Sequence, residues 1–385
     1  MIHAPPAEHD GKRPLWKKLR VSLASLAVLF VVAELGTRVA TWLYHDQNPY
    51  YLFYGFVSWT DEQGEGHSDK RDGYFKFPPN RRIEYGLPGG GRINNHGFRG
   101  ADFAAGKPAG VFRVVCLGGS STFGYYDPDD GTYPHLLAQR FAAEPAARPV
   151  EVLNLGVPHM NTSHVRALLV GEVLDYGPDA ITLYTGYNDA TFPVAESGLQ
   201  RLTRWVDEHS AAFAGFRKVL NARAGPVIFG QWNEYRTRVP REEVERQLEL
   251  HLEMTGDNLR AIVEEARARG IQVIFIRQAM SALDDRHERA LQGRPFPTYA
   301  EEYRQAAEEL EREGSLDGAL VPLYIHHHLT ELQARLADEY GLTLVDNVEL
   351  VDEHPESLLT FVHLSPEANG RLAERLAETL RPRIR

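Results

Sequence analysis

Short apolar runs alternate with amphipathic stretches along the chain from Val111 onward. Residues 163–176 place apolar side chains on one helical face, and residues 241–269 repeat leucine and isoleucine at helical spacing through a charged stretch. Bounded apolar runs rich in β-branched residues are typical of buried parallel strands. Because these runs alternate with helices, we expect an α/β fold with a doubly wound sheet. The predicted strands are residues 111–117, 150–155, 180–184, 272–276 and 342–345.

The amino-terminal region pairs a basic cluster with an apolar stretch. Lysines and arginines gather between residues 12 and 20, and the uncharged run Val21 to Ala33 follows. One helix over residues 21–44 would rise about 36 Å, which is enough to cross a hydrocarbon core of about 30 Å. Glu34 and Arg38 lie one helical turn apart in it, so we expect them to pair.

This pattern predicts an uncleaved signal anchor. Residues 1–20 are then a cytoplasmic basic tail and residues 21–44 a single transmembrane helix, because basic residues favour the cytoplasmic side. The rest of the chain would be periplasmic or extracellular. A cleaved signal peptide is the alternative, although no Ala-x-Ala cleavage site follows the apolar run. A buried amphipathic helix of a soluble protein fits the clustered cations poorly.

The remaining chain divides by composition. Residues 45–110 are rich in aromatic residues, glycine and proline, with little helical period, and are predicted to be a juxtamembrane segment that packs on the main domain. Residues 111–385 form that domain. Two stretches within it, about 191–240 and about 278–325, exceed ordinary connections and are predicted to be insertions beside the active face.

Composition excludes several classes of partner and cofactor. The 42 lysines and arginines against 53 acids give a net charge of −11, with no sustained basic run in the main domain, so nucleic acid is not an expected partner. One cysteine rules out an internal disulfide framework and any Cys-rich metal site. The motif His326-His327-His328 has no recognised zinc spacing and is predicted to be a solvated helix start. We therefore predict no metal and no cofactor.

A glycine-flanked hydroxyl follows the first predicted strand. The sequence there reads Cys116-Leu117-Gly118-Gly119-Ser120-Ser121-Thr122-Phe123-Gly124. In open α/β sheets, ligands bind beyond the carboxyl ends of strands, so Ser120 is placed to react. The segment is neither a phosphate loop nor a dinucleotide-binding loop, and Thr122 breaks the Gly-x-Ser-x-Gly pattern.

Three further segments accompany Ser120. Asn154-Leu155-Gly156-Val157-Pro158 ends the second strand, and Tyr184-Thr185-Gly186-Tyr187-Asn188-Asp189 ends the third. Phe361-Val362-His363-Leu364-Ser365-Pro366 lies near the carboxyl terminus. Together the four segments resemble, in order and spacing, the four blocks of the SGNH (GDSL-type) hydrolase superfamily. The resemblance covers about residues 92–380, and Ile93-Asn94-Asn95-His96-Gly97-Phe98-Arg99-Gly100 is similar to a segment of membrane-anchored bacterial members.

The resemblance implies a fold and a role for each matching residue. The fold would be a flavodoxin-like doubly wound parallel sheet of about five strands flanked by helices. Ser120 matches the nucleophile and His363 the general base. The N–H groups of Ser120 and Gly156 and the side-chain amide of Asn188 match the oxyanion hole. Serine needs a base to take its proton, and each preorganised oxyanion donor is worth about 3 kcal/mol.

The chain departs from the family pattern at two positions. Gly119 stands where the family has an aspartate before the serine, and Thr360 stands where it has the aspartate that orients the histidine. The Nδ1–H of His363 must then bond to the Thr360 hydroxyl, to a backbone carbonyl, or to an acid such as Asp352, Glu353 or Glu356. We expect a working but slow Ser–His dyad, since the imidazolium loses electrostatic support.

We therefore predict a membrane-anchored serine esterase that acts outside the cytoplasm. The resemblance implies that its substrates are O-acyl esters of glycans or lipids. Two alternatives stay open. The same Ser–His site can serve an O-acyltransferase, which passes the acyl group to a sugar hydroxyl. A non-catalytic glycan-binding relative is the other, although Ser120, Gly156, Asn188 and His363 are all intact. Tyr125 and Tyr126 either line the pocket or belong to the core.

Overall fold

The computed structural model describes residues 15–44, 74, 76–83, 91–191, 206, 210–213, 238–282, 289 and 291–384. The chain forms two units. The smaller unit consists of Met1–Glu62 and Ser197–Gly225, and the larger unit of Gln63–Glu196 and Pro226–Arg385. Each is described by itself below.

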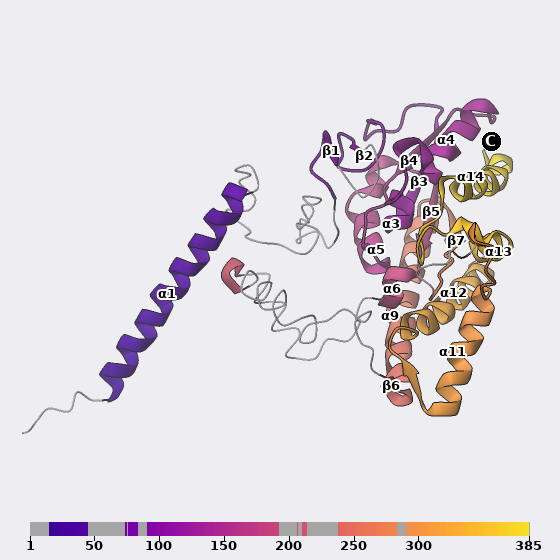
Figure 1. The fold of residues 1–385 in the computed structure, drawn as a ribbon. Coiled ribbons are helices and arrows are strands. Elements are labelled where there is room, and N and C mark those ends of the chain that lie inside the picture. Colours follow the sequence, from indigo (N-terminus) through magenta and orange to yellow (C-terminus); the bar gives the residue numbers. More distant parts are fainter. Residues whose placement is uncertain are drawn as a thin grey trace, which may run out of the picture. The chain divides into compact units, whose positions relative to one another are not determined.

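A five-stranded, entirely parallel sheet forms the centre of the larger unit (Figure 1). Its spatial order is β4-β3-β5-β7-β9. The five predicted strands are confirmed, each to within one residue at either end. They are β3 (Phe112–Gly118), β4 (Val150–Asn154), β5 (Ala180–Thr185), β7 (Gln272–Arg277) and β9 (Thr343–Asp346).

Side chains on the strands alternate between two hydrophobic clusters, one on each face of the sheet. On β3, Val114 and Cys116 belong to one cluster and Val115 and Leu117 to the other, all with no exposed surface. This two-sided burial explains why the strands read as continuous apolar runs. We name the two faces of the sheet after Val114 and Val115. The Val114 face is covered by α4 (Tyr133–Ala143), α13 (Asn347–Glu353) and α14 (Pro366–Leu380). The Val115 face is covered by α5 (Thr162–Gly171), α9 (Arg241–Ala268) and α12 (Val321–Tyr340).

The strand order creates a switch point. The chain passes from β3 to β4 on one side and then returns to β5 on the other side of β3. Crevices between the carboxyl ends of such strands are where α/β proteins bind ligands. Two short helices begin there, α3 (Ser120–Phe123) after β3 and α6 (Tyr187–Thr191) after β5. The predicted flavodoxin-like sheet is therefore confirmed, and it brings two of the predicted motifs to one edge.

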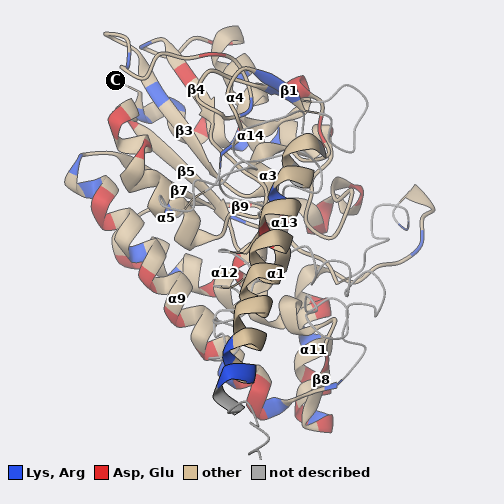
Figure 2. Ribbon diagram, turned by 90° about the vertical axis from the view of Figure 1, so that its left-hand side faces the viewer, with Lys and Arg blue, Asp and Glu red and all other residues tan. Residues whose placement is uncertain are grey.

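The remaining elements surround this core. The helix predicted over residues 163–176 is divided at Glu172 into α5 and the 3-10 turn η3 (Val173–Tyr176). Helix α9 carries acidic and basic residues on its outer surface (Figure 2). The other elements are α11 (Tyr299–Glu313), the antiparallel pairs β1 (Arg81–Ile83) with β2 (Gly91–Ile93) and β6 (Arg238–Pro240) with β8 (Ser315–Asp317), and the 3-10 turns η2 (Asp129–Gly131), η6 (Pro355–Ser357) and η7 (Arg381–Arg383).

Residues 91–100 contribute directly to the core of the larger unit. Ile93 and Phe98 are almost completely buried in the cluster on the Val115 face. Arg99 is 4% exposed and donates hydrogen bonds to the backbone carbonyls of Phe123, Gly124 and Asp127. Those carbonyls lie at and just after the end of the short helix α3, so Arg99 fixes the end of the turn that carries Ser120.

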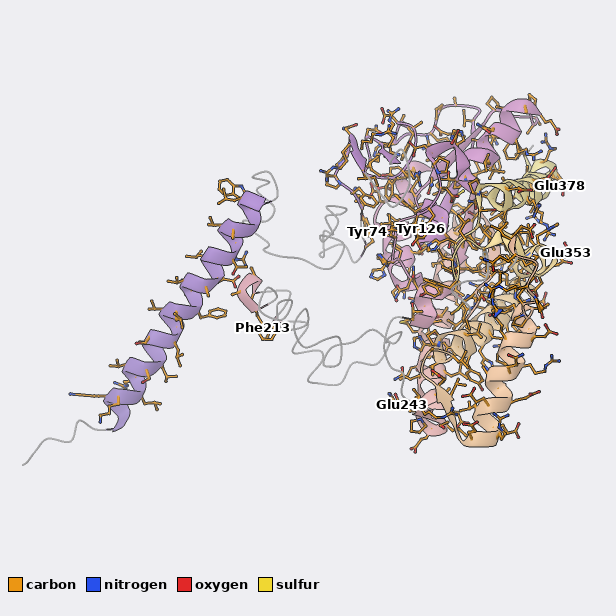
Figure 3. The ribbon with its side chains drawn as sticks, viewed as in Figure 1. Tyr74, Tyr126, Phe213, Glu243, Glu353 and Glu378 are labelled. Carbon is orange, nitrogen blue, oxygen red and sulfur yellow. The ribbon has the colours of Figure 1, made fainter. Side chains whose placement is uncertain are left out.

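The smaller unit contains the helix α1 (Leu15–Tyr44). Its segment Lys17–Ala40 has a mean hydropathy of 1.9 and is long and apolar enough to cross a membrane, a property that a signal sequence near the amino terminus shares. Carbon-rich side chains line α1 (Figure 3), while basic residues mark its first turns (Figure 2). The predicted Glu34–Arg38 pair is confirmed at 2.7 Å. The Glu34 carboxylate also accepts hydrogen bonds from the Ser210 hydroxyl and from the N–H groups of Ala211 and Ala212.

Candidate active site

A tight turn presents Ser120 at the end of β3. Gly118 has φ +157°, and a Cβ there would lie 2.4 Å from the carbonyl oxygen of Tyr184 on the neighbouring strand, so only glycine fits. Helix α3 then begins, and it ends at Gly124, which is in the left-handed conformation. Ser121, Thr122 and Phe123 are buried, whereas Ser120 is partly exposed. The turn thus offers one hydroxyl to the crevice.

A small hairpin near the carboxyl terminus positions His363. Leu358 and Leu364 form an antiparallel bridge, and the N–H of Leu359 donates to the carbonyl of His363 at 2.8 Å. This geometry turns the imidazole toward α3. His363 Nε2 lies 2.8 Å from Ser120 Oγ, although the two residues are 243 positions apart in the chain. A hydroxyl and an imidazole at this distance can exchange a proton.

The partner of the other imidazole nitrogen is the hydroxyl of Thr360, at 2.7 Å from Nδ1. The sequence left three kinds of partner open for Nδ1, and the structure has the Thr360 hydroxyl there rather than a backbone carbonyl or an acid. A hydroxyl can both donate and accept, whereas a carboxylate only accepts. Thr360 Oγ1 also accepts the N–H groups of Val362 and His363 at 3.4 and 3.3 Å. The threonine therefore orients the ring without enforcing the Nδ1–H tautomer that leaves Nε2 free to act as a base.

Burial determines the charge of His363. The side chain is 8% exposed, and this desolvation lowers its pKa to about 4. The ring is therefore neutral at pH 7. Tyr126, labelled in Figure 3, packs its ring against the imidazole with centroids 4.8 Å apart, and the ring of Tyr125 lies at 6.0 Å. Both tyrosines are partly exposed, and Tyr125 also packs against the hydrophobic cluster on the Val115 face of the sheet.

Asn188 on α6 lies against the glycine that precedes Ser120. Its Nδ2 donates to the carbonyl of Met160 at 2.8 Å, which fixes the orientation of the amide. A Cβ on Gly119 would lie only 2.5 Å from this Nδ2. The glycine at position 119 therefore leaves the space in which the Asn188 amide sits. A second amide hydrogen remains on Nδ2.

Gly156 lies beneath the nucleophile turn. Its N–H donates to Asn154 Oδ1 at 3.0 Å. A Cβ at this position would lie 2.4 Å from the backbone nitrogen of Phe123 and 2.7 Å from Thr122. The structure thus brings Ser120, His363 and Asn188 together, whereas the N–H of Gly156 is engaged within its own loop. Gly156 permits the close approach of that loop to α3.

A small pocket adjoins Ser120, with a cavity volume of about 10 Å³, which is roughly the space that one water molecule occupies. Gln278, the first residue after β7, connects the end of this strand to α6 and α3 beside the pocket. Its Oε1 accepts the N–H of Tyr187 at 2.7 Å, and its Nε2 donates to Ser121 Oγ at 3.0 Å. In the sequence, only the position of Gln278 at the end of a predicted strand pointed to a place in the site. The pocket is lined by Gly119, Ser120, Met160, Tyr184, Thr185, Gly186, Tyr187, Asn188 and Gln278.

The histidine run is not a solvated helix start, and that prediction is wrong. Helix α12 begins at Val321, so the histidines lie inside the helix. His326 has no exposed surface, and its Nδ1 is 2.7 Å from the hydroxyl of Tyr299. His327 stacks on the ring of Tyr303 with centroids 3.5 Å apart. Within the described ranges, no group of three or more His, Cys, Asp or Glu side chains is arranged to hold a metal ion.

Comparisons with known proteins give a family match and several similar solved structures. The model of the GDSL-like lipase/acylhydrolase family matches residues 116–371. Similar solved structures include a lipolytic protein of the G-D-S-L family from Desulfitobacterium hafniense DCB-2, with 15% identity, coverage of 70% of this chain and 99% of that one, and a TM-score of 0.39. A lipase/acylhydrolase from Enterococcus faecalis has 15% identity, covers 71% and 96% of the two chains, and gives a TM-score of 0.38. No curated protein sequence matches the chain.

Proposed function

Because the chain belongs to the GDSL-like lipase/acylhydrolase family, whose members hydrolyse esters, we propose that Ser120 is its nucleophile and His363 its general base. The observation that carries this proposal is the 2.8 Å contact between Ser120 Oγ and His363 Nε2. Two residues so distant in sequence meet at the switch point of the sheet, beside a pocket and an oriented amide. A reaction that uses both side chains explains this contact more simply than the packing of the fold does.

The proposed reaction proceeds in two halves. Ser120 transfers its proton to His363 Nε2 while Oγ attacks the ester carbonyl, and a tetrahedral oxyanion forms. The N–H of Ser120 and the second amide hydrogen of Asn188 donate to that oxyanion, each worth about 3 kcal/mol. The imidazolium then gives its proton to the leaving alcohol. Water attacks the acyl-enzyme with His363 again acting as base, which releases the acid and restores Ser120.

The pocket beside Ser120 leaves space next to the nucleophile for part of a substrate. We propose O-acyl esters carried by a glycan or lipid alcohol as the substrate class, which the acylhydrolase activity of the family supports.

The enzyme is further proposed to be a single-pass membrane protein with a cytoplasmic amino terminus and the larger unit in the periplasm or outside the cell. The length and hydropathy of α1 support this, as do the cations at its start. Alkaline carbonate extraction of membranes should leave the full chain in the pellet. A mature protein whose amino terminus begins after α1 would show instead that the segment is a cleaved signal peptide.

Hydrolysis of aryl acetates by the full-length protein in detergent tests the reaction. We expect Ser120→Ala and His363→Ala each to lower kcat by about 10³-fold or more, since the two groups act as one unit. Ser121→Ala is the matched control, because it removes the neighbouring hydroxyl that bonds to Gln278. It should retain most of the activity. Turnover that survives in Ser120→Ala would refute the assignment.

Product analysis distinguishes the related functions. Free acetate as the product in the presence of a sugar acceptor identifies a hydrolase. Acetylated acceptor identifies an O-acyltransferase that uses the same Ser–His site. A protein that turns over no ester and transfers no acyl group, yet binds glycans, would be the non-catalytic relative.

A further inference from the structure

A polar contact joins two parts of the smaller unit that are far apart in the chain. Glu34 of α1 lies 176 positions before Ser210, and its Oε2 accepts the Ser210 hydroxyl at 2.9 Å. The N–H groups of Ala211 and Ala212 donate to the same carboxylate at 2.9 and 3.0 Å. Arg38 supplies a fourth donor at 2.7 Å. A carboxylate has about four acceptor positions, so the hydrogen-bonding capacity of Glu34 is fully used.

One stripe of α1 is partly covered, while the apolar run before it is exposed. Every side chain between Val21 and Ala33 is exposed. The partly buried positions that follow recur three or four residues apart, which places them on one face of the helix. They are Glu34, Thr37, Arg38 and Trp42. The contact with residues 210–213 therefore lies on a defined face of the carboxyl-terminal part of α1.

Small residues form the other side of this contact. Ser210 is 5% exposed and Ala211 2%. The Ser210 hydroxyl also accepts the N–H of Phe213 at 3.1 Å, where a helical turn begins. Figure 3 shows Phe213 on this turn beside α1. Because small residues let two backbones approach closely inside a membrane, the segment is suited to pack against a transmembrane helix.

The contact bears on whether α1 remains in the protein. A signal peptide is absent from the mature chain, so its side chains have no lasting partner there. Loss of α1 would deprive the Ser210 hydroxyl and two backbone N–H groups of their acceptor. The pair with Arg38 alone would already offset the charge of Glu34 within α1. The three further donors therefore indicate a permanent structural contact.

The position of Glu34 along α1 places the contact near the outer boundary of the membrane. The uncharged run Val21 to Ala33 rises about 20 Å at about 1.5 Å per residue. Glu34 is the first charged residue after this run, which crosses most of a hydrocarbon core of about 30 Å. Residues 210–216 are also uncharged and include Phe213 and Phe216. The two segments thus match in polarity at the same depth.

We propose that residues 210–213 form a second membrane contact of the chain, docked on α1 through Glu34, and that α1 is retained in the mature protein as the partner of this segment. The inference rests on the proposed single-pass topology. In the chain, the docked segment lies between α6, which carries Asn188, and β6. The polypeptide is thus attached to its transmembrane helix twice, once through residues 45–73 and once through the dock.

Cutting the first of these two attachments tests the dock. A specific protease site is inserted between Glu62 and Gln63, the boundary of the two units, in the full-length protein. After cleavage in isolated membranes and a wash at high salt, the carboxyl-terminal fragment should remain in the membrane pellet. Release of this fragment from the wild-type protein would overturn the dock.

Variants on both sides of the contact show whether Glu34 is responsible. Glu34→Ala should weaken the association of the two fragments by about tenfold or more, the effect of losing hydrogen bonds to a charged group. Ser210→Ala removes one donor and should release a smaller part of the fragment. Leu35→Ala is the matched control, because this neighbouring side chain is 58% exposed, and it should leave retention unchanged. Equal retention in wild type, Glu34→Ala and Ser210→Ala would overturn the role of Glu34.

Thiol labelling tests the location of the docked segment. The single native cysteine, Cys116, is buried, so an introduced cysteine is the accessible thiol. In isolated membranes, Phe213→Cys should react with a charged maleimide several times more slowly than Val170→Cys, at a position of α5 that is 58% exposed. Phe213 is itself partly exposed, so its protection would come from lipid. Equal reaction rates would overturn the membrane location.

These outcomes differ from those that test the proposed function. A mature chain that begins after α1 would refute the membrane anchor and the dock together. An intact amino terminus with release of the cut fragment would refute the dock alone. Ester hydrolysis that persists in Ser120→Ala concerns only the catalytic assignment.

Discussion

At the scale of single residues, Thr360 is the most informative departure from the family pattern. Its hydroxyl lies beside His363 Nδ1, where the family has a carboxylate. A carboxylate can only accept a hydrogen bond, whereas a hydroxyl can also donate one. The threonine thus supplies geometry but neither the tautomer nor the charge. Proton transfer from Ser120 requires the Nδ1–H tautomer, which a carboxylate beside Nδ1 would enforce and a hydroxyl does not.

Thr360→Asp should therefore raise kcat for aryl acetates by about tenfold or more, because loss of the equivalent carboxylate in a complete triad is far more costly than that. The carboxylate would also stabilise the imidazolium and raise the pKa of His363 from about 4. The acid limb of the pH–rate profile should then move toward neutral pH. Thr360→Val, which removes only the hydroxyl, is the control and should lower kcat. An unchanged acid limb in Thr360→Asp would contradict this account of the dyad.

The resemblance to the four family blocks allowed the predicted site residues to be named from the sequence. Ser120, Asn188 and His363 each lie in one of these blocks, and the structure brings the three together. Gly156 is different, because sequence cannot show that the Asn154 side chain takes its N–H. Gln278 was missed because a bond between distant loops has no signature in the local sequence.

At the scale of elements, the turn from β3 into α3 depends on the space left by Gly119. The Asn188 amide lies where any side chain at position 119 would begin. Glycine at position 119, in place of the aspartate of the family pattern, thus leaves the space that the Asn188 amide occupies.

Gly119→Ala should displace Asn188 and lower kcat by about 10²-fold, which is the effect of losing one oxyanion donor. KM for aryl acetates should change little, since the donor acts in the transition state. Gly370→Ala in α14 is the matched control, because a Cβ there meets nothing within 4 Å. A Gly119→Ala variant with wild-type kcat would show that Asn188 is not an oxyanion donor.

Secondary structure was more predictable than its interruptions. The five buried strands have clear apolar limits in the sequence, and all five are present. The break at Glu172 was not predicted, because Val173 continues the helical spacing while Gly171 and Gly177 weaken the helix only locally. The histidines of α12 were misjudged because polar type suggested solvent, whereas Tyr299 supplies a buried partner for His326.

At the scale of the whole molecule, buried and partly buried neutral histidines couple stability to pH. Burial is the main cause that lowers the pKa of His159 and His326 to about 3, and of four others to about 4, against about 6.5 in an unfolded chain. Between pH 6.5 and 4 the unfolded chain therefore binds protons that the folded protein does not. This contribution to stability is complete above pH 6.5 and is lost as pH falls. The four others are His164, His251, His327 and His363.

Two buried carboxyl groups act in the opposite direction. Burial raises the pKa of Asp127 to about 7 and that of Asp189 to about 6, so the folded protein binds their protons first as pH falls. The histidines outnumber them, and Tm should accordingly decrease from pH 7 to pH 4.5 at fixed ionic strength. Calorimetry of the full chain in detergent measures this. A Tm that is equal or higher at pH 4.5 would show that the carboxyl groups dominate.

At this scale, the strand order explains how segments far apart in the sequence come together in the site. Alternating strands and helices predicted a parallel sheet, and the order β4-β3-β5-β7-β9 then places the ends of β3 and β5 side by side. The sequence alone could not predict that the carboxyl-terminal hairpin folds back over this edge. That return depends on packing between α14 and α4, whose residues share the cluster on the Val114 face.

The most direct measurement is labelling of the full-length protein with a fluorophosphonate, followed by peptide mapping. These reagents modify a serine that a neighbouring base has activated. The account predicts one adduct on Ser120, and its loss in His363→Ala. An adduct on any other residue, or labelling that is unaffected by His363→Ala, would contradict the central claim that these two side chains act together.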